Sequence, residues 1–195
     1  MSNHSALILD RDGTLNAMVC NPQGDQDSPY FSSQLEIYPG LGDLLRPWTN
    51  SGIPIFVVTN QPGIAKGHFK REDLLHLNSV LMDRLLKEGV KIQDIFSCIH
   101  HPVGTQQGDQ SLIGPCECRK PKPGMLHELH KKHRIDLAKA IFIGDSDVDQ
   151  KAAKAAGVGT FILVKTLISA TVPIEKQNYS FPNAPTLRSV LEKLS

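Results

Sequence analysis

Short apolar runs rich in β-branched residues recur along the chain, separated by longer segments with helical periodicity. A near-continuous apolar run is typical of a strand that is buried on both faces of a parallel sheet. On this basis, strands are expected at 6–9, 53–58, 95–98, 141–143 and 160–164.

The segments between these runs repeat apolar residues three or four positions apart, which is the spacing of one face of a helix. In the clearest case, a leucine repeat runs through 72–87 and Gly89 follows at the position of a C-terminal cap. Helices are expected at 41–49, 72–87, 125–133 and 147–156. Strands that alternate with helices predict an α/β fold, a three-layer, Rossmann-like sandwich around a mostly parallel sheet.

Two polar loops interrupt this rhythm. Segment 17–38 follows the first expected strand, and segment 100–114 contains three glycines. Loops of this length in a compact domain usually carry function. We expect a single domain over residues 1–195 with a minimal cap, in which loop 17–38 folds over the functional site and excludes water.

The composition is that of a globular protein with a full core. The 195 residues are 40% hydrophobic and 21% charged. Because 21 basic residues face 20 acidic ones without a basic cluster, the charge pattern does not favour a nucleic-acid partner. The first residues lack the flank and apolar stretch of a signal peptide, and no apolar run is long enough to span a bilayer. A cytoplasmic monomer without membrane contact is therefore expected.

Polar side chains follow three of the expected strands at the point where each strand ends. Asp10 and Asp12 follow the first strand, Thr59 the second and Asp145 the fourth. The carboxyl ends of parallel strands form the usual ligand crevice of such a sheet. Three carboxylates repel one another unless a cation lies among them, and an all-oxygen site suits Mg²⁺. Since a carboxylate can also act as a nucleophile and form an aspartyl-phosphate, these residues predict magnesium-dependent phosphate chemistry.

The same residues resemble the motifs of the haloacid dehalogenase (HAD) superfamily of phosphatases, in the same order along nearly the whole chain. The four matching segments are Asp10-Arg11-Asp12-Gly13-Thr14-Leu15, Thr59-Asn60-Gln61, Lys120-Pro121, and Gly144-Asp145 with Asp149. Four motifs in order, each after an expected strand, are much more specific than the first motif alone.

The resemblance implies a catalytic role for Asp10, Asp12, Thr59 and Lys120. Asp10 would attack phosphorus, and Asp12 would protonate the leaving oxygen and then take a proton from the hydrolytic water. Mg²⁺ would be bound by the carboxylates of Asp10 and Asp145 and by the backbone carbonyl of Asp12. Thr59 and Lys120 would hold the phosphoryl oxygens, where negative charge must be stabilised.

Three of the four cysteines and a histidine bracket the second polar loop. A Cys-x-His segment precedes it and a Cys-x-Cys segment follows it. Three thiolates and one imidazole form the closed tetrahedral set of a structural zinc. We expect Zn²⁺ at Cys98, His100, Cys116 and Cys118, with His101 as an alternative to His100, and Cys20 as a free thiol. We call segment 98–118 the cysteine loop.

This ligand pattern, followed by Arg-Lys-Pro, is not general to the superfamily. It is similar to a zinc-loop subgroup that contains D-glycero-D-manno-heptose 1,7-bisphosphate 7-phosphatases and histidinol-phosphate phosphatases, and segment 59–67 resembles the heptose enzymes more closely. The resemblance implies removal of the 7-phosphate of the heptose bisphosphate, a step in lipopolysaccharide precursor synthesis. Substrate contacts are expected from Asn60, Gln61, Pro62 and Arg119.

Two departures leave the substrate open. Loop 17–38 lacks the Asp-x-Gly-Tyr element of the heptose enzymes, and Ser146 stands where those enzymes often have lysine. Histidinol-phosphate phosphatase activity is therefore one alternative, and a non-catalytic phospho-ligand-binding protein of the same fold is another. The intact motif residues argue against the second alternative.

Overall fold

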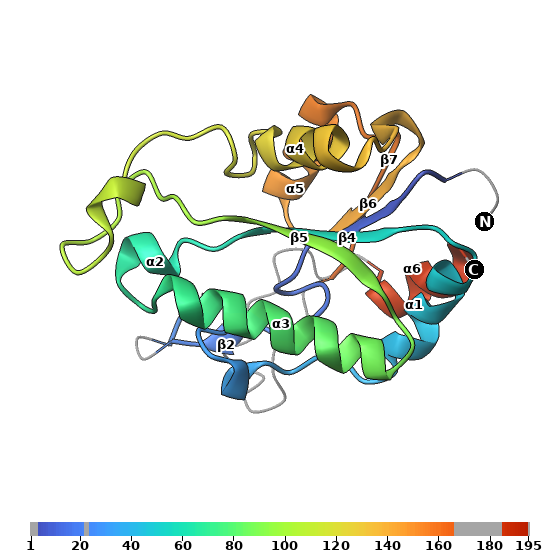
Figure 1. Ribbon diagram of the computed structural model, residues 1–195, viewed down its shortest axis with the longest axis horizontal. Helices are drawn as coiled ribbons and strands as arrows, with labels where there is room; N and C mark the ends of the chain where they lie inside the picture. The colour runs from blue at the N-terminus through green and yellow to red at the C-terminus, as the bar shows by residue number, and fades with distance from the viewer. Residues whose placement is uncertain (1–3, 22–23, 166–184, 195) are drawn as a thin grey trace.

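The central sheet has five strands, all parallel, in the order β5-β4-β1-β6-β7. The computed structural model describes residues 4–21, 24–165 and 185–194. The strands of this sheet are β1 (Leu7–Leu9), β4 (Ile55–Asn60), β5 (Ile92–Cys98), β6 (Ile141–Gly144) and β7 (Thr160–Leu163). Each expected strand is present, and β1 lies at the centre of the sheet (Figure 1).

Helices cover both faces of this sheet (Figure 1). They are α1 (Leu41–Asn50), α2 (Gly63–Lys66), α3 (Arg71–Lys87), α4 (Gly124–His133), α5 (Asp147–Ala156) and α6 (Leu187–Leu194). Short 3-10 turns lie at η1 (Ser32–Gln34), η2 (Gln110–Leu112) and η3 (Leu137–Lys139). No helix in the described ranges is long and apolar enough to cross a membrane.

Alternating strand side chains build two separate cores. Leu7 and Leu9 of β1 pack with α1, α3 and α6, whereas Ile8 faces the opposite way and packs with α4 and α5. Figure 1 shows the same division, with α4 and α5 on one side of the sheet and α1, α3 and α6 on the other. The three-layer α/β sandwich expected from the sequence is confirmed.

Strand β5 begins earlier than the expected range of 95–98. It is an edge strand, and in its first half Ile92 is buried while Gln93 is exposed. Two polar residues, Gln93 and Asp94, interrupt this half, so it does not read as the continuous apolar run used to find the other strands.

Loop 17–38 contains a small antiparallel hairpin, β2 (Val19–Cys20) and β3 (Gln26–Asp27), and then η1. Strands of two residues are too short to show a period-two pattern, so the sequence indicated only a loop.

The ends of β1, β4 and β6 lie together because β1 is flanked by the other two. Leu9 is paired with Val57 on one side and with Ile143 on the other. Beyond β1 the chain turns at Gly13, whose φ of 82° favours glycine and whose N–H donates to the Asn16 carbonyl at 2.8 Å. This topology brings the residues that follow the three strands to one edge of the sheet.

Candidate active site

A cavity of about 240 Å³ lies at the carboxyl edge of the sheet, beside the ends of β1, β4 and β6. Its lining residues are Asp10, Asp12, Met18, Gln26, Ser28, Thr59, Asn60, Lys120, Asp145, Ser146 and Val148. The four expected catalytic residues and the expected magnesium-binding Asp145 thus meet in one place, although the sequence separates them widely.

Loop 17–38 supplies part of this lining through Met18, Gln26 and Ser28. The far end of the loop is anchored by Tyr30, whose ring centroid lies 4.8 Å from that of His68 and 5.7 Å from that of Phe69. The hairpin is therefore held beside the site by aromatic contacts with the segment between α2 and α3.

Lys120 is the buried cation of the site. Its Nζ donates to Asp10 Oδ1 at 2.7 Å and to the Val58 carbonyl at 2.9 Å, and lies 2.6 Å from Asp149 Oδ1. Burial alone would lower the pKa of Lys120, but the charges of Asp10 and Asp149 outweigh it and raise the pKa above its ordinary value. Lys120 is therefore a fixed ammonium, hydrogen-bonded to Asp10 and to the Val58 carbonyl and ion-paired with Asp149.

Three carboxylates gather beside this ammonium. Asp10, Asp145 and Asp149 each place an oxygen within 4.8 Å of the others. Burial raises the pKa of Asp10 well above its ordinary value, and Asp149 and Asp145 add to this effect while Lys120 opposes it. A divalent cation among these oxygens would favour the ionised form of Asp10, and oxygen ligands of this kind suit Mg²⁺.

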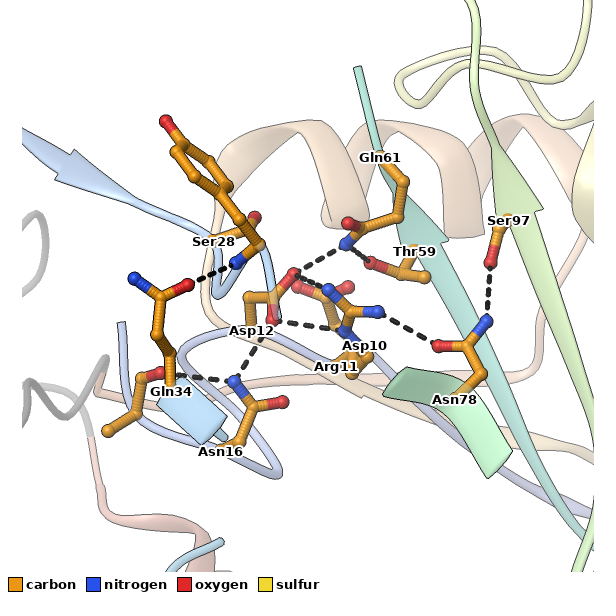
Figure 2. A network of polar contacts seen from close by, with 12 residues as sticks. Asp10, Arg11, Asp12, Asn16, Ser28, Gln34, Thr59, Gln61, Asn78 and Ser97 are labelled. Carbon is orange, nitrogen blue, oxygen red and sulfur yellow. Dashed lines mark hydrogen bonds and ion pairs between the residues drawn. The ribbon is translucent and has the colours of Figure 1, made fainter. Parts of the chain in front are cut away.

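The carboxylate of Asp12 belongs to a different set of contacts, which Figure 2 shows. Arg11 donates from Nε to Oδ1 at 3.0 Å and from Nη2 to Oδ2 at 3.1 Å. Gln61 Nε2 donates to Oδ2 at 2.6 Å, and Asn16 Nδ2 donates to Oδ1 at 3.0 Å. Burial would raise the pKa of Asp12, but Arg11 and hydrogen bonds from Asn16 and Ser28 outweigh it, and the pKa lies below its ordinary value.

Two residues at the end of β4 line the cavity and make defined hydrogen bonds. The buried Thr59 hydroxyl accepts a hydrogen bond from Gln61 Nε2 at 2.8 Å. Asn60 makes two hydrogen bonds with the backbone of Lys120: its Nδ2 donates to the Lys120 carbonyl and its Oδ1 accepts from the Lys120 N–H, both at 3.0 Å. The position of the lysine is thus coupled directly to the end of β4.

The expected substrate-binding residues are distributed unevenly around the site. Asn60 lines the cavity, whereas the lining, as far as the chain is described, does not include Gln61, Pro62 or Arg119. Gln61 is fully buried and binds Asp12 and Thr59 instead. Arg119 is half-buried on the side of the cysteine loop, where burial and the charges of Arg119 and Lys66 lower the pKa of His101.

Cys98, His100, Cys116 and Cys118 form a second cluster, in which one ligand atom from each lies within 4.8 Å of the others. Cys116 Sγ lies 3.7 Å from Cys98 Sγ and 3.6 Å from Cys118 Sγ, and Cys98 and Cys118 approach to 2.8 Å. Tetrahedral zinc with Zn–S bonds of about 2.3 Å places sulfurs about 3.8 Å apart. The donor set and two of the three spacings therefore fit Zn²⁺.

The two adjacent histidines have different surroundings. His100 Nδ1 lies 3.3 Å from Cys118 Sγ, so it belongs to the cluster. His101 Nδ1 instead accepts from the N–H groups of Val103 and Gly104, at 3.3 and 3.0 Å. This geometry favours His100 over His101 as the fourth ligand.

The middle of the cysteine loop is docked on α2. The Ala65 carbonyl accepts from the Thr105 N–H at 3.2 Å, and the Ile64 carbonyl accepts from the Asp109 N–H at 3.1 Å. Gly108 permits this approach, because a Cβ at that position would lie 1.9 Å from the Ala65 oxygen. The loop is therefore tied to the segment that directly follows the Thr-Asn-Gln motif.

Three residues in the polar network were given no role from the sequence. Asp149 has a recognisable place in the fourth motif, but its position at the start of α5 equally suits a capping box with Ser146, which it also forms. Arg11 lies between two aspartates on a segment expected to be extended, where it should point away from them. Asn78 lies within an amphipathic helix, and nothing in its local sequence indicates a link to the site.

The comparisons with known proteins agree with this geometry. The family described as HAD-hydrolase-like matches residues 117–194. The D-glycero-beta-D-manno-heptose-1,7-bisphosphate 7-phosphatase of Yersinia pestis is 37% identical over 161 residues, which are 83% of this chain and 80% of the relative. The D-glycero-alpha-D-manno-heptose-1,7-bisphosphate 7-phosphatase of Campylobacter jejuni is 35% identical over 159 residues, 82% of this chain and 81% of the relative.

A solved structure extends the likeness to three dimensions. The D,D-heptose 1,7-bisphosphate phosphatase of B. bronchiseptica, complexed with magnesium and phosphate, superposes with a TM-score of 0.71 at 29% identity, and the match covers 97% of both chains. The fold, the clustered motif residues and the extent of these matches lead to one conclusion. The chain belongs to the heptose-1,7-bisphosphate 7-phosphatase family of HAD-like hydrolases.

Proposed function

We propose that this protein removes the 7-phosphate of D-glycero-D-manno-heptose 1,7-bisphosphate through an aspartyl-phosphate on Asp10. The observation that carries the proposal is the buried Asp10 carboxylate, held 2.7 Å from the Lys120 ammonium in the cavity at the sheet edge. A carboxylate beside a fixed cation and an acidic cluster can attack a phosphate ester, whereas a simple phosphate-binding site does not call for a carboxylate in this position.

In the first step, an Asp10 oxygen forms a bond to phosphorus while the bond to the sugar oxygen breaks. Thr59 and Lys120 would stabilise the negative charge on the phosphoryl oxygens. Two donors of Lys120 are engaged by Asp10 and the Val58 carbonyl and Asp149 is ion-paired with it, so a phosphoryl oxygen would use the remaining donor or displace one of these partners.

Asp12 would carry the proton in both steps. As a carboxylic acid it would give a proton to the departing sugar oxygen. As a carboxylate it would take a proton from the water whose oxygen then attacks the aspartyl-phosphate and regenerates Asp10. The lowered pKa of Asp12 favours the carboxylate, the form that the second step requires. For the first step one of the four donors on its oxygens would have to withdraw, so that the carboxyl group can bind the proton.

Magnesium would be held by the carboxylates of Asp10 and Asp145 and the backbone carbonyl of Asp12. When bound there, the ion supplies positive charge between the nucleophilic carboxylate and the phosphoryl group. Asp149 reaches the same cluster, but its ion pair with Lys120 and its bond to the Ser146 N–H already engage it. Asp149 is therefore better suited to orient Lys120 than to bind the metal.

Zinc at the cysteine cluster would be structural. Cys118 stands two residues before Lys120, and the loop is also docked on α2. A tetrahedral metal that fixes Cys118 would therefore fix the approach of Lys120 to the cavity, without an open position for activating water.

The substrate is tested by comparing kcat/KM for the alpha and beta anomers of the heptose bisphosphate with that for histidinol phosphate. We expect kcat/KM for one heptose anomer to exceed that for histidinol phosphate by at least about 100-fold. A site whose polar groups pair with sugar hydroxyls rejects a ligand that leaves those protein groups unpaired. The curated relatives include enzymes for both anomers at similar identity, so either anomer satisfies the proposal. A preference for histidinol phosphate would overturn the substrate and leave the chemistry on Asp10 standing.

A further inference from the structure

Arg11 is a fully buried guanidinium with its donors committed to two side chains. Nε and Nη2 form a fork on the two oxygens of Asp12, at 3.0 and 3.1 Å, and Nη1 donates to Asn78 Oδ1 at 2.9 Å. Burying a charged group is costly unless it is paired and hydrogen-bonded, so an apolar residue would serve a purely structural purpose at least as well. The planar guanidinium of arginine can instead fix the orientation of a carboxylate, because two of its N–H groups match the two carboxylate oxygens.

Asn78 anchors this fork from a different part of the fold. It lies on α3, between Leu77 and Leu81 of the helix core, and its Nδ2 donates to Ser97 Oγ on β5 at 3.4 Å. A chain of contacts therefore runs from β5 through α3 to Arg11 and ends on Asp12 (Figure 2). Since α3 is packed against the sheet, Asn78 gives the guanidinium a rigid point of attachment.

Asn16 and Gln61 donate the remaining hydrogen bonds to the Asp12 carboxylate. Asp12 Oδ1 accepts from Arg11 and Asn16, and Oδ2 accepts from Arg11 and Gln61. Any rotation of the carboxylate would break at least two of these hydrogen bonds. Because the four bonds fill the acceptor sites of both oxygens, one of the two amide donors, Asn16 or Gln61, must withdraw when the carboxyl group carries a proton, while the Arg11 fork still holds its orientation. The same Gln61 amide also donates to Thr59, so the carboxylate is held at a set distance from the phosphate-binding hydroxyl.

We propose that Arg11, anchored by Asn78, is a positioning residue that holds the Asp12 carboxyl group on the leaving-group side of the phosphoryl group. The inference rests on the proposed function, in which Asp12 gives its proton to the departing oxygen as the P–O bond breaks. Arg11 itself touches neither the substrate nor the reacting atoms. Its contribution is the geometry of the proton transfer, to which general acid catalysis is sensitive.

The dependence of kcat/KM on the leaving group of the phosphate ester distinguishes this positioning role from a structural one. The alkoxide of a sugar needs a proton as it leaves, whereas p-nitrophenolate leaves readily without one. The ratio kcat/KM reports only the steps up to the release of the first product, so the later attack of water does not enter it. A positioning defect at Asp12 therefore lowers kcat/KM for the sugar phosphate and spares p-nitrophenyl phosphate, while partial unfolding lowers both equally.

The test uses the full-length magnesium-loaded protein with Arg11→Gln, Arg11→Lys and Asn78→Ala, each assayed on the heptose bisphosphate and on p-nitrophenyl phosphate. We expect kcat/KM for the heptose bisphosphate to fall about 100-fold in Arg11→Gln and about 10-fold in Asn78→Ala, with a fall below about 3-fold for p-nitrophenyl phosphate. Arg11→Lys keeps the charge but not the fork, so it should show the same selective loss as Arg11→Gln. Ser79→Ala, the exposed neighbour on α3, is the matched control and should match wild type on both substrates.

Equal losses on the two substrates, full activity of Asn78→Ala, or full rescue by Arg11→Lys would each overturn the inference. Asp12→Ala, assayed in parallel, distinguishes this failure from failure of the proposed function. If Asp12→Ala loses activity without leaving-group selectivity, the proton-carrying role of Asp12 is wrong. If Asp12→Ala is selective and the Arg11 variants are not, only the positioning role of Arg11 is wrong. Should the heptose bisphosphate not be turned over, any alkyl phosphate that wild type hydrolyses serves for the same ratio.

Discussion

Replacing Asn60 by alanine tests how the end of β4 holds Lys120, the lysine proposed to bind the phosphoryl group. The side chain of Asn60 makes two hydrogen bonds with the backbone of Lys120, both 3.0 Å long. Each such bond contributes about 0.5–1.5 kcal/mol net, so Asn60→Ala should lower the free energy of unfolding by about 1–3 kcal/mol. Loss of the clamp also frees Lys120 to shift, and a displacement near 1 Å can lower turnover about 100-fold.

Urea unfolding followed by tryptophan fluorescence measures the first effect. Trp48 is the single tryptophan and is fully buried against the core on the α1 side of the sheet, so its emission reports global unfolding. The midpoint should fall while the dependence on urea stays unchanged, since the variant exposes no extra surface. Steady-state kcat on a phosphate ester measures the second effect.

Asn50→Ala is the matched control, because Asn50 is exposed at the end of α1. It should leave the free energy of unfolding within about 0.5 kcal/mol of wild type. Asn60 does not hold Lys120 in place if Asn60→Ala is as stable as this control, or if it is destabilised but turns over substrate at the wild-type rate.

Three further predictions address the other parts of the site. Asp10→Asn should fold normally and have no measurable turnover, checked by circular dichroism and phosphate release; wild-type hydrolysis would exclude Asp10 as the nucleophile. Asp149→Asn should lower the free energy of unfolding by about 3 kcal/mol, because the buried ion pair with Lys120 loses one of its two charges, and a neutral effect in urea titration would contradict the pair. Removing zinc from the cysteine cluster with a chelator should lower both the thermal midpoint and turnover, and unchanged values in protein shown to be metal-free would refute the positioning role of the metal.

The sheet and the carboxylates of the site could be predicted because they depend on strong local patterns. The buried strands are apolar on both faces, and Asp10 and Asp145 directly follow two of them. The topology then brings such strand ends together without any further information, because the parallel strands all end at one edge. The Cys-x-His and Cys-x-Cys segments were equally readable, since metal ligands leave a spacing pattern in the sequence.

The hydrogen bonds that hold Arg11, Asp12 and Lys120 in place could not be predicted in the same way. Asn78 reaches Arg11 across 67 positions of sequence, and Asn60 reaches the backbone of Lys120 across 60. Asn78 lies on a helix where an asparagine has no pattern of its own, and the motif that contains Asn60 predicted a substrate contact and not the hydrogen bonds to Lys120. Gln61 was expected to bind substrate, but its burial behind Asp12 depends on how the loop after β4 packs, which only the tertiary structure determines.

The hairpin in loop 17–38 illustrates a second limit. Its strands are too short for periodicity, and its position over the cavity depends on contacts between Tyr30 and the α2–α3 segment. The length and place of the loop predicted a functional segment, whereas the side chains with which it lines the cavity, including Gln26 and Ser28, emerge only from the fold.

The most direct test of the central claim is to locate the phosphoryl group on the enzyme during turnover. Wild-type protein mixed with substrate and magnesium, quenched in acid within one turnover and analysed by peptide mass spectrometry, should carry a phosphoryl group on the peptide that contains Asp10 and on that residue. A phosphoryl group on any other residue, or a quenched enzyme that is never phosphorylated although product forms at the normal rate, would contradict the account.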